Sequence, residues 1–98
     1  MDRTYKISDI IKSKQKIVVD DKDTNSIYEF VNNGGSWYVR AQDPRAIEIN
    51  FDKGINGDHA FSGKDVCQHL KKVHKKGSKI MYDVDSKLTD VTKDLIME

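Results

Sequence analysis

The chain has 98 residues, a length that suits one domain, and charged residues make up 34% of it. Its formal net charge of +1 at pH 7 excludes an overall charge bias as the basis for choosing a partner. A single cysteine excludes an intrachain disulfide, and no apolar run approaches the roughly 20 residues of a membrane-spanning helix. The first residues also lack the apolar segment of a signal peptide. We therefore expect a small cytoplasmic protein that does not act on membranes.

The first part of the chain predicts a short helix and then a strand. Residues 8–14 are expected to form the helix, with Ser8 as its N-cap. One side of this helix carries Ile7, Ile10 and Ile11. Residues 16–21 are rich in β-branched side chains and end in a polar turn, a pattern typical of a strand.

Residues 26–32 admit two interpretations. In the first, Ser26 and Glu29 form the capping box of a helix that ends before Gly34. In the second, residues 26–32 and 36–42 form a hairpin that turns at Asn33-Gly34, because an Asn-Gly pair accepts the positive φ angles of a type I′ turn.

The hairpin is favoured because it orders four large side chains at once. In this register Phe30 lies opposite Trp37 and Tyr28 lies opposite Val39, all on one face of the strand pair. The other face carries Glu29, Tyr38 and Arg40. An aromatic ring and a guanidinium on an uncovered sheet face are groups that stack on bases or anchor a protein partner.

The middle of the chain predicts one more strand and a loop. Pro44 interrupts the chain after the hairpin. Residues 46–52 then alternate apolar and polar side chains, as a half-buried strand does. Residues 53–61 contain two glycines and are expected to form a loop.

Residues 62–76 give the clearest helix signal in the sequence. Ser62 is expected to cap the helix, Asp65 lies near its positive end, and Gly77 ends it. At about 100° per residue, one stripe collects Val66, Cys67, Leu70, Val73 and His74. Lysines occupy the opposite side.

The last part of the chain predicts a strand over residues 79–84 and a helix over residues 87–97, where apolar residues recur at helical spacing. The expected fold class is α+β, with a mostly antiparallel sheet of about five strands and helices packed on it. The expected strands are 16–21, 26–32, 36–42, 46–52 and 79–84, and the expected helices are 8–14, 62–76 and 87–97.

A local basic patch is more informative than the total charge. Residues 64–79 contain six lysines and one acidic residue, Asp65. Such a patch binds phosphate backbones in some proteins and is only a solvated outer face in others. The candidate nucleic-acid-binding residues are Lys64, Lys71, Lys72, Lys75, Lys76 and Lys79, with Arg40 as a helper.

Neither a catalytic site nor a metal site is expected. Cys67 and His74 share a helix face, but His69 is expected to point more than about 100° away from both. His59 lies in the predicted loop without a serine or glutamate placed to partner it. No cofactor-binding motif is present either.

Two functions remain after these exclusions. The first is a small non-enzymatic protein that contacts the phosphate backbone of nucleic acid through the lysine-rich helix. The alternative is a protein-interaction module, such as a small inhibitor, adaptor or homodimer of the bacterial or phage type. The alternative depends on an uncovered sheet face and on the acidic residues near the end of the chain.

Overall fold

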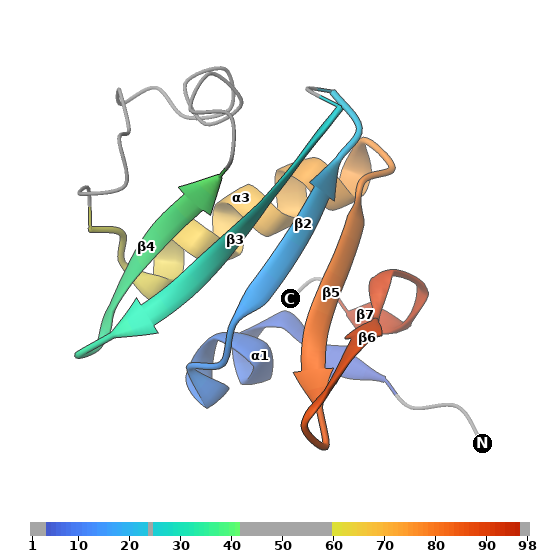
Figure 1. Ribbon diagram of the computed structural model, residues 1–98. Coiled ribbons are helices and arrows are strands. Elements are labelled where there is room, and N and C mark those ends of the chain that lie inside the picture. The colour runs from blue at the N-terminus through green and yellow to red at the C-terminus, as the bar shows by residue number, and fades with distance from the viewer. Residues whose placement is uncertain (1–3, 24, 42–59, 97–98) are drawn as a thin grey trace.

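The computed structural model describes residues 4–23, 25–41 and 60–96 of the chain. A five-stranded antiparallel sheet has the order β4-β3-β2-β5-β6, and helix α3 crosses one of its faces (Figure 1). The strands of this sheet are β2 (Ile17–Asp21), β3 (Ser26–Asn33), β4 (Ser36–Ala41), β5 (Lys79–Val84) and β6 (Lys87–Asp90). The helices are α1 (Ile7–Ser13) and α3 (Gly63–Lys75). A small parallel pair joins β1 (Tyr5–Lys6) to β7 (Leu95–Ile96), which follows the 3-10 turn η1 (Thr92–Asp94).

The predicted α+β class is confirmed, and so are four of the predicted strands. The strand expected at residues 46–52 lies outside the described residues, as do Pro44 and most of the predicted loop at 53–61. The fifth strand of the sheet is instead β6, which pairs with β5 in an antiparallel hairpin.

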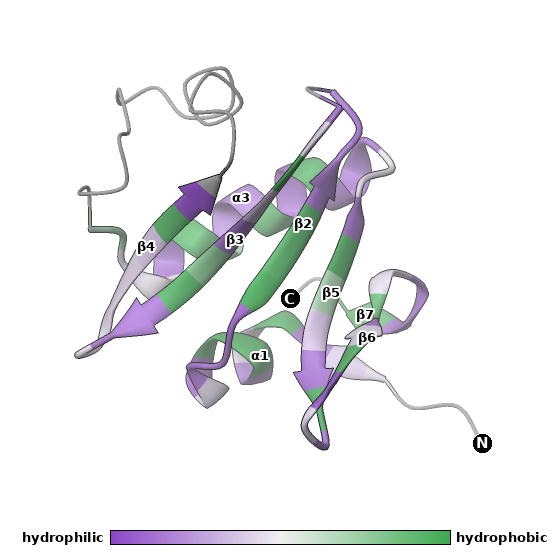
Figure 2. Cartoon of the chain, in the orientation of Figure 1, coloured by the Kyte–Doolittle hydropathy of each residue, from purple (hydrophilic) through white to green (hydrophobic). Residues whose placement is uncertain are grey.

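One core joins the sheet to both helices. Alternate residues of the strands point toward α3, among them Ile17, Val19 and Ile80, each with no exposed surface. Strand β2 is apolar from Ile17 to Val19 and polar only at its end (Figure 2), as suits a central strand. Helix α1 adds Ile7 and Ile10 to this core.

Helix α1 confirms the predicted apolar side but not the predicted cap. It begins at Ile7, after Lys6, and no side chain caps it. Ser8 therefore lies inside the helix. The start of the helix follows from strand β1, because the backbone of Lys6 is still extended where the strand pairs with β7.

The predicted hairpin is confirmed with a register shifted by two residues. The turn is Gly34-Gly35, with φ angles of 65° and 94°, so Phe30 pairs with Val39 and Asn32 pairs with Trp37. Two adjacent glycines accept a pair of positive φ angles at less cost than Asn-Gly does. Because a shift of two preserves the face of every side chain, the four predicted residues are still buried together: Tyr28, Phe30, Trp37 and Val39.

The helix predicted at residues 87–97 is wrong. Asp85 and Ser86 both have positive φ angles, 52° and 66°. They form a two-residue turn between Val84 and Lys87 that sends the chain back along β5. The apolar spacing was misleading, because Leu88 remains 44% exposed while Val91 is fully buried.

Helix α3 confirms the predicted capping at both ends. The Ser62 hydroxyl accepts a hydrogen bond from the Asp65 N–H at 3.1 Å, and the Asp65 carboxylate accepts one from the Ser62 N–H at 3.2 Å. At the other end, the Gly77 and Ser78 N–H groups bond back to His74 and Val73, each at 3.0 Å. Gly77 has a φ of 92°, which a side chain would disfavour. Both ends of the helix are therefore fixed by local hydrogen bonds.

Candidate nucleic-acid interface

The outward side of α3 carries a row of exposed lysines. Its inward side buries Val66, Leu70 and Val73 against the sheet, with exposed fractions of 1% or less. Helical periodicity turns the intervening positions to solvent. We name the four exposed residues Lys64, Lys71, Lys72 and Lys75 the lysine face.

The carboxylates of the described residues do not balance the charge of the lysine face. Within the described ranges, no ion pair joins any of its four ammonium groups to an acidic side chain. Asp65 is the acidic residue of the helix, and its carboxylate bonds the Ser62 N–H. Lys71 and Lys75 are four residues apart, an arrangement of like charges that costs roughly 0.2–0.5 kcal/mol in a helix. A bound polyanion would relieve this repulsion.

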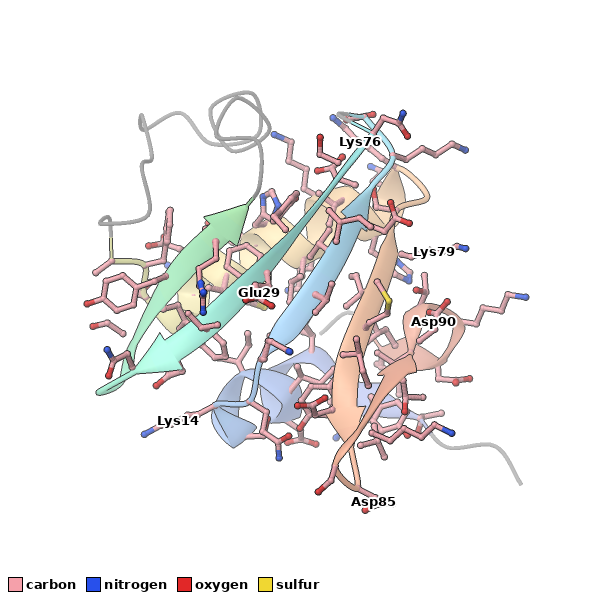
Figure 3. All side chains as sticks on the ribbon, viewed as in Figure 1. Lys14, Glu29, Lys76, Lys79, Asp85 and Asp90 are labelled. Carbon is pink, nitrogen blue, oxygen red and sulfur yellow. The ribbon has the colours of Figure 1, made fainter. Side chains whose placement is uncertain are left out.

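Lys76 differs from its neighbours on the helix. Its Nζ lies 2.6 Å from Oδ2 of Asp23, a residue in the connection between β2 and β3. Figure 3 shows Lys76 at this end of the sheet. Both side chains are partly exposed, at 45% and 41%. The ammonium of Lys76 is thus compensated within the chain, and this lysine is less available to an external anion than the lysine face.

Lys79 and Arg40 lie on the far side of the sheet from α3. Each alternates along its strand with a buried residue that faces α3, Ile80 in the case of Lys79 and Val39 in the case of Arg40. Lys79 is paired in register with Asp20. Arg40 lies 3.8 Å from Glu29. Of the seven predicted residues, the structure therefore brings four together in the lysine face. Lys76 is paired with Asp23, and Lys79 and Arg40 lie on the opposite side of the sheet.

The side of the sheet away from α3 is not covered by any described helix, and we call it the open face. Its half-buried apolar residues are Val18, Val31, Tyr38 and Met81. Ile27 and Leu88 lie on the same face with exposed fractions of 59% and 44%. Charged side chains of both signs separate these residues, and Glu29 lies within 4 Å of both Arg40 and Lys16.

Behind the lysine face, α3 is linked to the sheet by a buried polar cluster. The Tyr28 hydroxyl donates to Asp21 Oδ2 at 2.7 Å and lies 2.6 Å from His69 Nε2. Since the hydroxyl proton is directed at Asp21, the His69 Nε2 carries its own proton and donates to the Tyr28 oxygen. Burial lowers the pKa of His69 to about 4. Burial, with the Asp21 carboxylate, raises the pKa of Tyr28 above its usual range.

This cluster supports the helix and is not placed to react. Asp21, Tyr28 and His69 have exposed fractions of 1%, 2% and 5%, so a substrate has no access to them. His69 was expected to point more than about 100° away from Cys67 and His74, and the burial of its ring was not predicted. At about 100° per residue His69 lies roughly 60° from Val66 and 40° from Val73, on the flank opposite Cys67 and His74. The sequence signal that could have indicated the burial of His69 is the inward-facing Tyr28, because a buried hydroxyl requires a hydrogen-bond partner.

The other described histidine and cysteine, His74 and Cys67, have separate surroundings. His74 Nε2 lies 2.8 Å from the Thr92 carbonyl oxygen. Cys67 is a half-buried free thiol. No group of three potential metal ligands occurs in the described part of the chain. His59 lies outside the described residues.

Comparisons with protein-family models, curated proteins and solved structures found no match to this chain. No described helix is long and apolar enough to cross a membrane. The surface chemistry of α3 and of the open face therefore carries the functional argument.

Proposed function

We propose that this protein is a small non-enzymatic nucleic-acid-binding protein that contacts the phosphate backbone through the lysine face of α3. The observation that carries the proposal is the set of four exposed ammonium groups, none of them in an ion pair with another described residue, on one side of a helix that is fixed at both ends. The single free thiol suits the cytoplasm as the place of action.

Phosphate binding follows from the chemistry of these side chains. A lysine ammonium is a compact point charge on a flexible stem, and it attracts a phosphate without demanding one geometry. Each neutralised phosphate releases condensed counterions, which makes binding favourable at low salt and weaker as salt is added. Contacts of this kind position a protein on nucleic acid and carry no sequence information. We therefore propose binding without sequence preference.

A charge-neutralising double variant tests this proposal. Lys71→Gln with Lys75→Gln removes two of the four charges and also removes the like-charge pair, so the fold is not expected to suffer. We expect the affinity for nucleic acid at about 50 mM salt to fall on the order of tenfold or more, and the slope of log K against log salt to become shallower by about 2. Fluorescence anisotropy with a labelled oligonucleotide measures both quantities.

The matched control removes two charges elsewhere. Lys87 and Lys93 are exposed and lie outside α3, on β6 and η1. The Lys87→Gln, Lys93→Gln variant has the same net charge as the test variant and is expected to bind nearly as well as the unaltered protein. Equal losses in the two double variants would mean that only net charge matters, and the assignment to α3 would then be wrong.

A second candidate function uses the open face. Two large apolar side chains, Ile27 and Leu88, are exposed on it, and half-buried apolar residues lie between them. An uncovered sheet face of this type is a common site of protein association. The mixed charges around it favour a protein partner over a polyanion.

A further inference from the structure

We infer that the lysine face recognises double-stranded nucleic acid in preference to single strands. This inference rests on the proposed function and names the class of nucleic acid that the same site takes. Two features carry it: the rigidity of the helix that bears the lysines, and the position of the aromatic side chains.

The backbone positions that carry these lysines are held in a fixed line. Lys64 and Lys75 are eleven residues apart, which is about 16 Å along a helix axis, and Lys71 and Lys75 are about 6 Å apart. The helix cannot bend freely, because its ends are capped and its inner side is buried against the sheet. The His69–Tyr28 contact adds a polar link to β3.

A duplex offers a matching line of charge. Its phosphates are fixed in position, with one negative charge per about 1.7 Å of axis. A single strand is flexible and has a lower charge density, so it must be ordered before several phosphates meet a rigid row of lysines. Preorganisation on both sides therefore favours the duplex.

Single-strand binding normally depends on aromatic stacking, and the lysine face has no aromatic platform. Helix α3 contains no Phe, Trp or Tyr. The aromatic rings buried in the core are Tyr28, Phe30, Trp37 and Phe61. Tyr38 lies on the open face, and Tyr5 packs edge-to-face with Tyr82, with ring centroids 6.5 Å apart. Within the described residues, no exposed ring is thus placed beside the lysines to receive an unpaired base.

A comparison of the affinities for duplexes and for single strands tests the inference. Anisotropy titrations would use a duplex DNA of about 20 base pairs, a duplex RNA of the same length and each single strand of the same sequence, at about 50 mM salt. With four phosphate contacts, slopes of about −0.9 per contact for duplex and −0.7 for single strands predict roughly tenfold tighter binding to the duplex. Binding to the DNA duplex, the RNA duplex or both that is tighter than binding to the single strands supports the inference, and the two duplex arms show which backbone is used.

Failure of this inference is distinguishable from failure of the proposed function. Single strands that bind as tightly as the duplex, and lose affinity in the Lys71→Gln, Lys75→Gln variant, would overturn the duplex preference and leave phosphate binding intact. Absence of lysine-dependent binding in every arm would overturn both.

Discussion

Replacement of Tyr28 by phenylalanine is expected to lower the free energy of unfolding by about 2–4 kcal/mol. The substitution keeps the aromatic ring in the core and removes only the hydroxyl. Asp21 then loses a charge-assisted hydrogen bond of 2.7 Å, and His69 loses the oxygen 2.6 Å from its Nε2. Both side chains are buried, so water cannot easily replace what they lose.

Urea denaturation near neutral pH measures this effect. Trp37, the one tryptophan of the chain, is 1% exposed and reports on the core through its fluorescence. The control is Tyr38→Phe, which removes a hydroxyl from the half-buried side chain on the open face and is expected to change stability by less than about 0.5 kcal/mol. Equal effects of the two substitutions would show that the buried cluster contributes nothing special to stability.

Mild acid is expected to destabilise the protein through His69. Burial lowers the pKa of this side chain from 6.5 to about 4 in the folded protein, against an opposing effect of Asp21 and a reinforcing effect of Lys72. The folded state therefore resists protonation that the unfolded chain accepts. The stability contributed by neutral His69 is present above about pH 6.5 and is lost as the pH falls toward 4. Over the whole interval between these two pH values, the free energy of unfolding falls by roughly 3 kcal/mol.

A titration of stability with pH, repeated on a His69→Gln variant, isolates this contribution. Glutamine has no proton to gain, and its amide can still donate to the Tyr28 oxygen. We expect the variant to show a flatter profile between about pH 6.5 and 4. Asp90 contributes at lower pH, because hydrogen bonds from Thr92 lower the pKa of its carboxyl below 3.8. An unchanged slope in the variant would contradict the assignment to His69.

The elements that could be predicted from the sequence are those determined by local signals. The Ser62–Asp65 capping box and Gly77 mark both ends of α3, and the burial of Val66, Leu70 and Val73 follows from helical periodicity. The β3–β4 hairpin was also predictable, although its register depended on a choice between two glycine-containing turns one residue apart, which changes the pairing by two residues.

The elements that escaped prediction depend on tertiary contacts. Residues 87–96 have helical apolar spacing, yet their backbone pairs with β5 and β1, and Thr92 Oγ1 accepts a hydrogen bond from the Ile80 N–H at 2.8 Å. A local sequence pattern does not indicate which distant strand a segment will pair with.

The candidate site was predictable where local helical geometry determines it, and not where it depends on tertiary contacts. Helical geometry alone groups Lys64, Lys71 and Lys75. The Lys76–Asp23 ion pair joins residues 53 positions apart, and the separation of Lys79 and Arg40 from α3 depends on which face of the sheet the helix covers.

The most direct measurement of the lysine face is a map of backbone amide chemical shifts during titration with a duplex of about 20 base pairs at low salt. Phosphate binding by α3 predicts that the largest shifts occur at Lys64, Lys71, Lys75 and their neighbours on the helix, and that added salt reverses them. Shifts concentrated at Val31, Tyr38 and Met81 on the open face, or no shifts at all, would contradict it.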